Sequence, residues 1–188
     1  MGDPARRRAS YEDLIALPPH QVGEIIDGVL YSQPRPAARH ALATTVLSGE
    51  IVPAFGRGRG GPGGWVILVE PELHLGPEPD VIVPDLAGWR RERMPEMPDT
   101  ANFTLAPDWA CEVLSDSTRK LDRSKKLPIY ARERVAHVWL VDPIAKLLEI
   151  FRLDGDGYRL VVTFADEALC RAEPFHAIEL DLAALWQR

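Results

Sequence analysis

Two acidic residues stand in or directly after apolar runs of this chain, and they constrain its fold more than any other feature. Glu112 lies inside the run from Trp109 to Leu114, and Asp85 follows the run Val81 to Val83 and a proline. Short apolar runs bounded by turn residues are typical of buried β-strands. A carboxylate buried in a strand is costly unless something pairs with it. The sequence therefore predicts strands that lie side by side and share a partner for both acids.

A divalent cation is the partner that suits two such carboxylates. Mg²⁺ prefers oxygen ligands and usually takes one or two carboxylates together with water and substrate phosphate. A cationic segment follows the second acid, with Lys120, Lys125 and Lys126. Two acids and a lysine are the set that a metal-dependent phosphodiesterase needs. We therefore expect Asp85 and Glu112 to hold Mg²⁺, for which Mn²⁺ would substitute.

Composition places the chain among soluble globular proteins. Its 188 residues suit one domain, and its 46% apolar and 27% charged fractions are ordinary. No apolar run approaches the roughly 18 residues of a membrane span, and no secretory signal follows the N-terminal arginines. Two cysteines, Cys111 and Cys170, form neither a disulfide framework nor a zinc quartet, which favours the cytoplasm. The net charge of −6 argues against broad nucleic-acid binding but leaves a local basic face open.

Helical and strand signals mix along the chain and predict one mixed α/β domain over residues 10–188, after a disordered arm at residues 1–9. A capping box at Ser10 and Asp13 opens a short helix, and Asp27-Gly28 turns a hairpin between Val22 and Tyr31. The other expected elements are a helix within 37–54, a glycine-rich loop at 56–64, a strand at 65–69 that continues to residue 74, a strand at 81–83, a polar loop at 88–104, a strand at 109–114, a helix ending near 133, strands at 135–141, 147–153 and 158–164, and a last short helix capped by Asp181.

Several short motifs in a fixed order resemble the Uma-type restriction endonuclease family within the PD-(D/E)XK nuclease superfamily. Their order and spacing, rather than any single motif, carry the resemblance over about residues 11–153. The motifs are Glu24 to Gly28, His40, Val83 to Leu86, Cys111 to Ser115, Asp122 with Lys126 and Tyr130, and Val138 to Pro143.

The resemblance implies a restriction-endonuclease-like core, in which helices flank a twisted mixed β-sheet. It also implies Mg²⁺-dependent cleavage of DNA, with Asp85 and Glu112 as the acids of the motif. The motif's lysine belongs two residues after Glu112, where this chain has Leu114. Lys126 on the following helix matches a lysine that has moved in this family. By analogy with enzymes that cut both strands, the resemblance also implies a homodimer.

Other residues near the motifs keep two interpretations open. Glu24 is either a further carboxylate of the site or an ordinary strand residue. Asp80 also follows a proline, but it precedes the strand at 81–83, and sites in α/β sheets favour the carboxyl ends of strands. We therefore choose Asp85. The lone histidines His40 and His74 favour structural roles.

Two other functions fit parts of the sequence. A degenerate nuclease fold could bind nucleic acid or protein without cutting, which the displaced lysine and the acidic charge favour. A two-carboxylate glycosidase is the third possibility. The aromatic content of 7% argues against it, because such enzymes line their clefts with aromatic residues.

Overall fold

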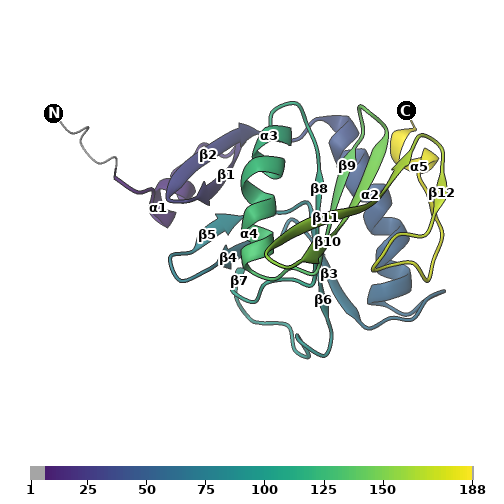
Figure 1. Ribbon diagram of the computed structural model, residues 1–188. Helices are drawn as coiled ribbons and strands as arrows, with labels where there is room; N and C mark the ends of the chain where they lie inside the picture. The colour runs from purple at the N-terminus through teal and green to yellow at the C-terminus, as the bar shows by residue number, and fades with distance from the viewer. Residues whose placement is uncertain (1–6, 188) are drawn as a thin grey trace.

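The computed structural model describes residues 7–187, and two β-sheets organise them (Figure 1). The larger sheet has the strand order β11-β10-β9-β8-β6-β3, and the smaller one has the order β2-β1-β5-β4-β7. The large sheet comprises β3 (Trp65–Val69), β6 (Leu86–Arg90), β8 (Trp109–Val113), β9 (His137–Asp142), β10 (Leu147–Asp154) and β11 (Gly157–Ala165). The small sheet comprises β1 (Gln21–Ile26), β2 (Val29–Pro34), β4 (Glu72–Leu75), β5 (Asp80–Ile82) and β7 (Asn102–Phe103). The strands β12 (Leu169–Cys170) and β13 (Leu180–Asp181) pair separately.

Helices lie on both sides of the large sheet. These are α2 (Ala38–Ile51) with the wide turn η1 (Val52–Gly56), α3 (Arg119–Leu121), η2 (Asp122–Lys126), α4 (Leu127–Arg132) and α5 (Ala183–Trp186). The short helix α1 (Tyr11–Ile15) instead packs against β1 of the small sheet. Figure 1 shows α2 and α4 on opposite sides of the central strands. No helix among the described residues is long and apolar enough to span a membrane. The mixed α/β class is confirmed, with two sheets where the sequence predicted one.

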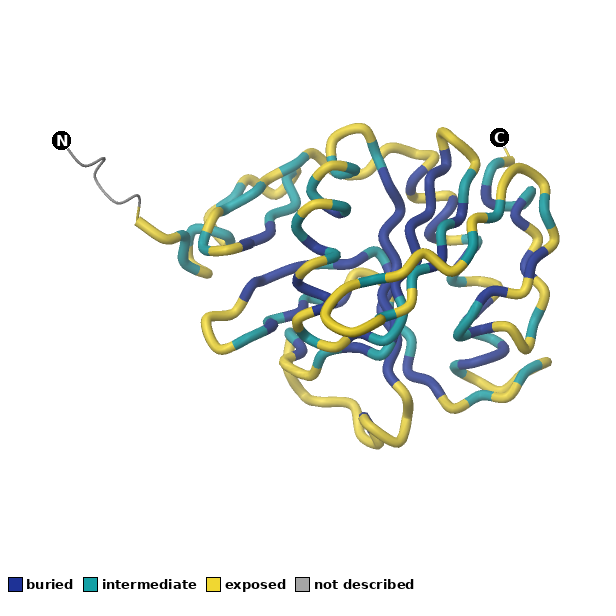
Figure 2. Tube along the Cα trace, viewed as in Figure 1, coloured by how far each residue is buried: buried dark blue, intermediate teal, exposed yellow. Residues whose placement is uncertain are grey.

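Strand β8 lies at the centre of the large sheet, and its alternation decides where the second acid points. Trp109, Cys111 and Val113 belong to the core cluster under α2, whereas Ala110 and Leu114 belong to the cluster under α4. Because successive side chains in a strand point to opposite faces, Glu112 shares the α4 face with Ala110. All of β8 is buried, as the dark central strands of Figure 2 show.

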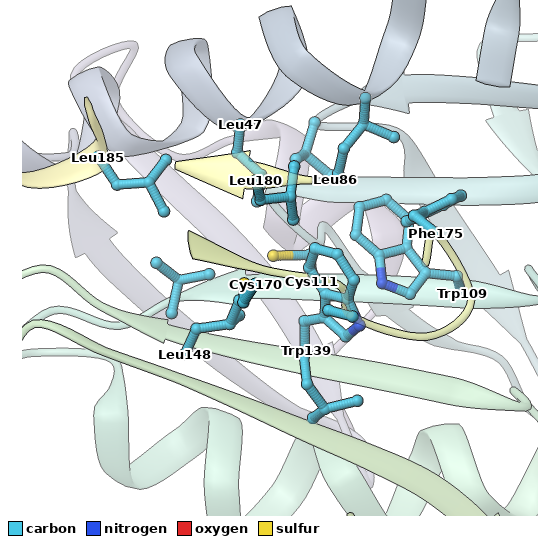
Figure 3. Packing of buried hydrophobic residues seen from close by; sticks show 14 of the residues in the cluster. Leu47, Leu86, Trp109, Cys111, Trp139, Leu148, Cys170, Phe175, Leu180 and Leu185 are labelled. Atoms are coloured by element: carbon cyan, nitrogen blue, oxygen red, sulfur yellow. The ribbon is translucent and has the colours of Figure 1, made fainter. Parts of the chain in front are cut away.

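Aromatic rings fill the core on the α2 side of the sheet. The ring of Phe175 lies 4.8 Å from Trp109 and 5.6 Å from Trp139, both edge-on. Figure 3 shows these rings beside Leu47 of α2 and Cys111 of β8. Offset and edge-on pairs are the arrangements that aromatic rings prefer. The core makes β8 rigid, so the acid on its other face is held in a fixed place.

The polar loop predicted at residues 88–104 is wrong at its start. Leu86–Arg90 forms β6, a central strand between β8 and β3. The cause is Gly88, because the rings of Trp65 and Trp109 cross it and would lie 3.2 Å from an added Cβ. A glycine followed closely by arginines does not resemble a strand in sequence, and a larger residue at this position would require the two rings to shift. Residues 102–103 also form a short strand.

The continuation of the strand 65–69 to residue 74 is also wrong. Glu70 has a φ of +49°, a turn conformation that ends β3. The next strand, β4, belongs to the other sheet, where it pairs with β5 and β7. The alternation in residues 70–74 was therefore that of a new strand.

Most of the other predicted elements are confirmed. Ser10 and Asp13 form the capping box, and Asp27 and Gly28 turn the β1–β2 hairpin. The carboxylate of Asp181 accepts a hydrogen bond from the amide of Ala183 at the start of α5. Of the predicted arm, residues 1–6 lie outside the described residues, and the amide of Ala9 bonds to the carbonyl of Gly28.

Candidate active site

Asp85 lies between β5 and β6, where the chain passes from one sheet to the other. Its Oδ2 accepts a hydrogen bond of 2.6 Å from the amide of Val113 on β8. Its Oδ1 lies 3.0 Å from Nε2 of His40 in the first turn of α2. Asp85 thus follows β5, as the sequence suggested, and also directly precedes β6. Its carboxylate is fixed against the end of the strand that carries Glu112.

Glu112 is buried and both of its carboxylate oxygens have partners. Lys126 Nζ donates to Oε2 at 3.0 Å, and the Tyr130 hydroxyl donates to Oε1. Both partners come from the helical segment that covers this face of the sheet. The spacing of Asp122, Lys126 and Tyr130 in the sequence predicted one common face, and all three side chains lie on the buried side of this segment.

Lys126 is the meeting point of three carboxylates. Besides Glu112, its ammonium lies 2.9 Å from Glu24 Oε1 and 3.3 Å from Asp122 Oδ1. Its side chain is only 3% exposed. Burial lowers the pKa of Lys126, but the carboxylates of Glu112, Glu24 and Asp122 outweigh it and hold the pKa well above its ordinary value. The lysine is therefore a fixed cation.

A widened helical turn places this lysine. Residues 122–126 form a π-turn, in which the amide of Leu127 bonds to the carbonyl of Asp122. Such turns occur where a helix is distorted for function. The turn also accommodates Pro128 at the start of α4, the residue that the sequence marked as awkward inside a helix.

The cluster contains more acidic groups than basic ones. Four carboxylates, those of Glu24, Asp85, Glu112 and Asp122, surround one ammonium and the His40 ring. Burial and the neighbouring acids raise the pKa of Glu112 well above its usual range, against the opposing effect of Lys126. Two buried oxygens, Glu24 Oε2 and Asp122 Oδ1, accept no hydrogen bond within residues 7–187. The cluster therefore keeps unused acceptor oxygens.

The donor set therefore fits a hard divalent cation in chemistry and in charge. Among the described residues, no group of three or more His, Cys, Asp or Glu side chains is spaced to share one ion. Mg²⁺ does not require such a group, because it usually keeps several waters and binds one or two carboxylates. Asp85 and Glu112 line one cleft, together with Asp122 of the cluster and the further acids Glu70, Glu72 and Asp116.

That cleft has a volume of about 590 Å³ and opens over the cluster. Asp85, Glu112 and Lys126 line it. The exposed cations Arg35 and Arg39 line it as well, as does the turn at residues 115–118, which carries three hydroxyl groups and one carboxylate. A volume of this size is that of ordinary ligand sites.

His40 is the site residue whose role the sequence did not suggest. Its ring is buried, and burial lowers its pKa, but the hydrogen bond and charge of Asp85 outweigh burial and raise the pKa above the usual histidine value. A lone histidine at a helix start gives no signal of such a contact. The fold creates it by placing the first turn of α2 beside the segment between β5 and β6.

Other candidate residues lie elsewhere. Asp80 accepts a hydrogen bond from the amide of Asp27 and pairs with Arg132 at 2.9 Å, so it ties the hairpin to α4. His74 pairs with Glu72 at 2.8 Å. Arg90 lies over the Trp65 ring and Arg91 bonds to the Trp65 carbonyl, so neither pairs with Asp85. Burial raises the pKa of the Cys111 thiol, as expected of an inert core cysteine.

Comparison with known proteins agrees with this architecture. A crystal structure of a putative nuclease of the DUF820 family from Anabaena variabilis superposes with a TM-score of 0.75. The two sequences are 20% identical, and the match covers 95% of this chain and 97% of the other. No curated protein matches the sequence. The Uma2 family, described as putative restriction endonuclease, matches residues 9–184. The chain therefore belongs to the Uma2 family of putative restriction endonucleases.

Proposed function

We propose that this protein is a Mg²⁺-dependent endonuclease that hydrolyses phosphodiester bonds of DNA at the cleft over Asp85 and Glu112. The observation that supports it is the cluster itself, in which buried carboxylates outnumber cations on the floor of a cleft. Buried excess charge is costly to keep. Structural stability alone gives no reason to retain it.

Asp85 and Glu112 would hold the ion, and hydrogen bonds from neighbouring groups fix the position of each carboxylate. His40 and the Val113 amide fix Asp85, while Tyr130 fixes Glu112. A bound Mg²⁺ supplies Lewis-acid polarisation of the phosphoryl oxygen and lowers the pKa of its water. The positions of the two carboxylates thus depend on α2, β8 and α4 together.

Lys126 would orient the attacking water or stabilise charge that develops on the phosphoryl group. Preorganised donors of this kind are effective because they need no rearrangement during the reaction. Glu24 and Asp122 hold the ammonium in place at 2.9 Å and 3.3 Å. We assign Glu24 this positioning role.

The setting of the enzyme is part of the proposal. Cleavage of both strands would need two such sites, so we propose a homodimer with a two-fold axis. Both cysteines are free and buried, which suits a reducing cytoplasm.

One observation favours a second function, that of a nuclease fold that binds nucleic acid or protein without cutting it. Every oxygen of Asp85 and Glu112 already has a protein partner. A site closed by its own side chains need not bind an ion. Ion binding measured by calorimetry separates the two functions, because the binding module predicts none at this cleft.

Plasmid cleavage tests the main proposal. The wild type should nick or linearise supercoiled plasmid with Mg²⁺ or Mn²⁺ and not with EDTA. Glu112→Gln should reduce the rate by at least about a hundredfold, with an unchanged circular dichroism spectrum. Cleavage by Glu112→Gln at the wild-type rate would show that the assigned site is wrong.

A further inference from the structure

A second groove, of about 600 Å³, runs on from the cleft. The two hollows share Arg39, Pro143 and Ile144, so they are continuous. The first turn of α2, the turn between β9 and β10, and α5 line this groove. Figure 1 shows α5 beside α2 at the C-terminal end of the described chain. Nothing in the cluster around Lys126 requires such an extension.

The floor of this groove is apolar and open to solvent. Leu42 is 37% exposed and Ile144 is 53% exposed, with Leu185 and Trp186 beside them. Single exposed aliphatic residues are common on protein surfaces, but a cluster of them in a concave surface marks a binding site. The occupant must therefore present apolar surface of its own.

Both charged residues that line the groove are positively charged. Arg39 and Lys146 lie on its rim, and no acidic residue lines it. Some other cations of the fold pair with acids, as Arg119 does with Asp142 at 2.7 Å and Arg132 with Asp80. Within residues 7–187, neither Arg39 nor Lys146 has a carboxylate within ion-pair distance. The occupant must therefore carry negative charge as well.

We propose that this groove binds an unpaired stretch of the nucleic-acid strand next to the bond that is cut. An unpaired strand offers what the groove requires, because its phosphates suit the rim cations and its exposed base faces suit the apolar floor. A duplex keeps its base faces covered and would leave the floor in contact with water. The inference rests on the proposed function, since Arg39 lies where the groove meets the cleft.

The substrate would therefore be a duplex with an unpaired flank. Fluorescence anisotropy in Ca²⁺ can compare a blunt DNA duplex with the same duplex extended by a short single-stranded tail. Stacking of one base on an aromatic side chain, here Trp186, contributes about 1–3 kcal/mol, so the wild type should bind the tailed duplex at least about tenfold more tightly.

Matched variants show whether the preference for the tailed duplex depends on this groove. The double variant Arg39→Ala, Lys146→Ala should lose most of the preference for the tail. The double variant Arg57→Ala, Arg59→Ala removes the same charge from exposed residues beyond the far end of α2, which is about 20 Å long, and should keep the preference. Ile144→Ser tests the floor at an exposed position that is safe for folding, and should lower the preference severalfold.

Four results would overturn the inference. Equal affinity of the wild type for both duplexes would refute the groove and leave the nuclease proposal intact, whereas failure to bind either duplex would refute both. An equal loss of preference in the Arg57 and Arg59 control would show a general charge effect. A dimer in sedimentation experiments that the Arg39 and Lys146 variant converts to monomers would make the groove a contact between copies of this chain.

Discussion

The charge balance of the cluster depends on Lys126. This ammonium contacts Glu24, Glu112 and Asp122 and is the cation closest to the centre of the cluster. Lysine is not a metal ligand, so Lys126→Ala should lower the cleavage rate by about 10²–10³-fold and keep divalent-ion binding.

Lys125→Ala is the matched control for this prediction. Its side chain is 43% exposed, and its ammonium pairs with Asp27 at 3.1 Å, outside the cleft. This variant should keep most of its activity and lose only some DNA affinity, in a salt-dependent way. Plasmid assays and titration calorimetry check both variants, and exchanged behaviour of the two lysines would contradict the assignment.

His137 makes the stability of the fold depend on pH. Burial lowers its pKa below the ordinary value of 6.5, with Arg152 and Arg90 acting in the same direction and Glu173 against it. The folded protein therefore binds a proton less readily than the unfolded chain does. This contribution to stability is present above pH 6.5 and is lost as the pH falls below it.

Urea unfolding of the wild type and His137→Gln at a series of pH values measures this contribution. The wild type should lose more unfolding free energy than the variant as the pH falls below 6.5. Parallel curves for the two proteins would show that His137 makes no such contribution.

At the scale of the elements, β6 depends on a single glycine. A Cβ at Gly88 would lie 3.2 Å from both Trp65 and Trp109, whose rings are buried in the core. Gly88→Ala should therefore cost about 1–3 kcal/mol of unfolding free energy, as overpacking does. Gly49 in α2 has no atom within 4 Å of an added Cβ, so Gly49→Ala should raise stability by about 0.5–1 kcal/mol. Thermal unfolding checks the pair, and stabilisation by both substitutions would contradict the packing described for β6.

The elements also show how far the sequence alone could lead. Strands with continuous apolar runs, such as β8 and β9, were predictable because burial on both faces leaves that pattern. Strand β6 was not predictable. Its residue Gly88 packs against the rings of Trp65 and Trp109, which belong to β3 and β8, about 20 residues away along the chain in either direction. The widened turn at residues 122–126 was also not predictable, because the spacing of apolar residues in the sequence does not distinguish an α-turn from a π-turn.

The same limit applies to the site. Asp85, Glu112 and Lys126 were named from motif order, and the structure brings Glu112 and Lys126 into contact. The contacts of Glu24 with Lys126 and of His40 with Asp85 join residues far apart in the chain. Side-chain contacts between sheets depend on how the layers pack, and local sequence patterns carry no record of that.

For the whole molecule, the proposed ion site predicts that stability depends on divalent ions. A ligand that binds only the native state stabilises it by mass action, by about 2.7 kcal/mol at a hundred times its Kd. For a chain of this size that corresponds to a rise in Tm of about 5–10 °C. The wild type should show this rise with Mg²⁺ or Mn²⁺ at millimolar concentration.

The most direct test of the central claim is the Tm of the wild type and of Asp85→Asn, each with and without Mn²⁺. Asparagine keeps the shape of the side chain and removes one charged oxygen of the expected ion site. The account predicts a rise in Tm with Mn²⁺ for the wild type and little or none for Asp85→Asn. An equal rise in both proteins would place the ion away from Asp85 and contradict the account.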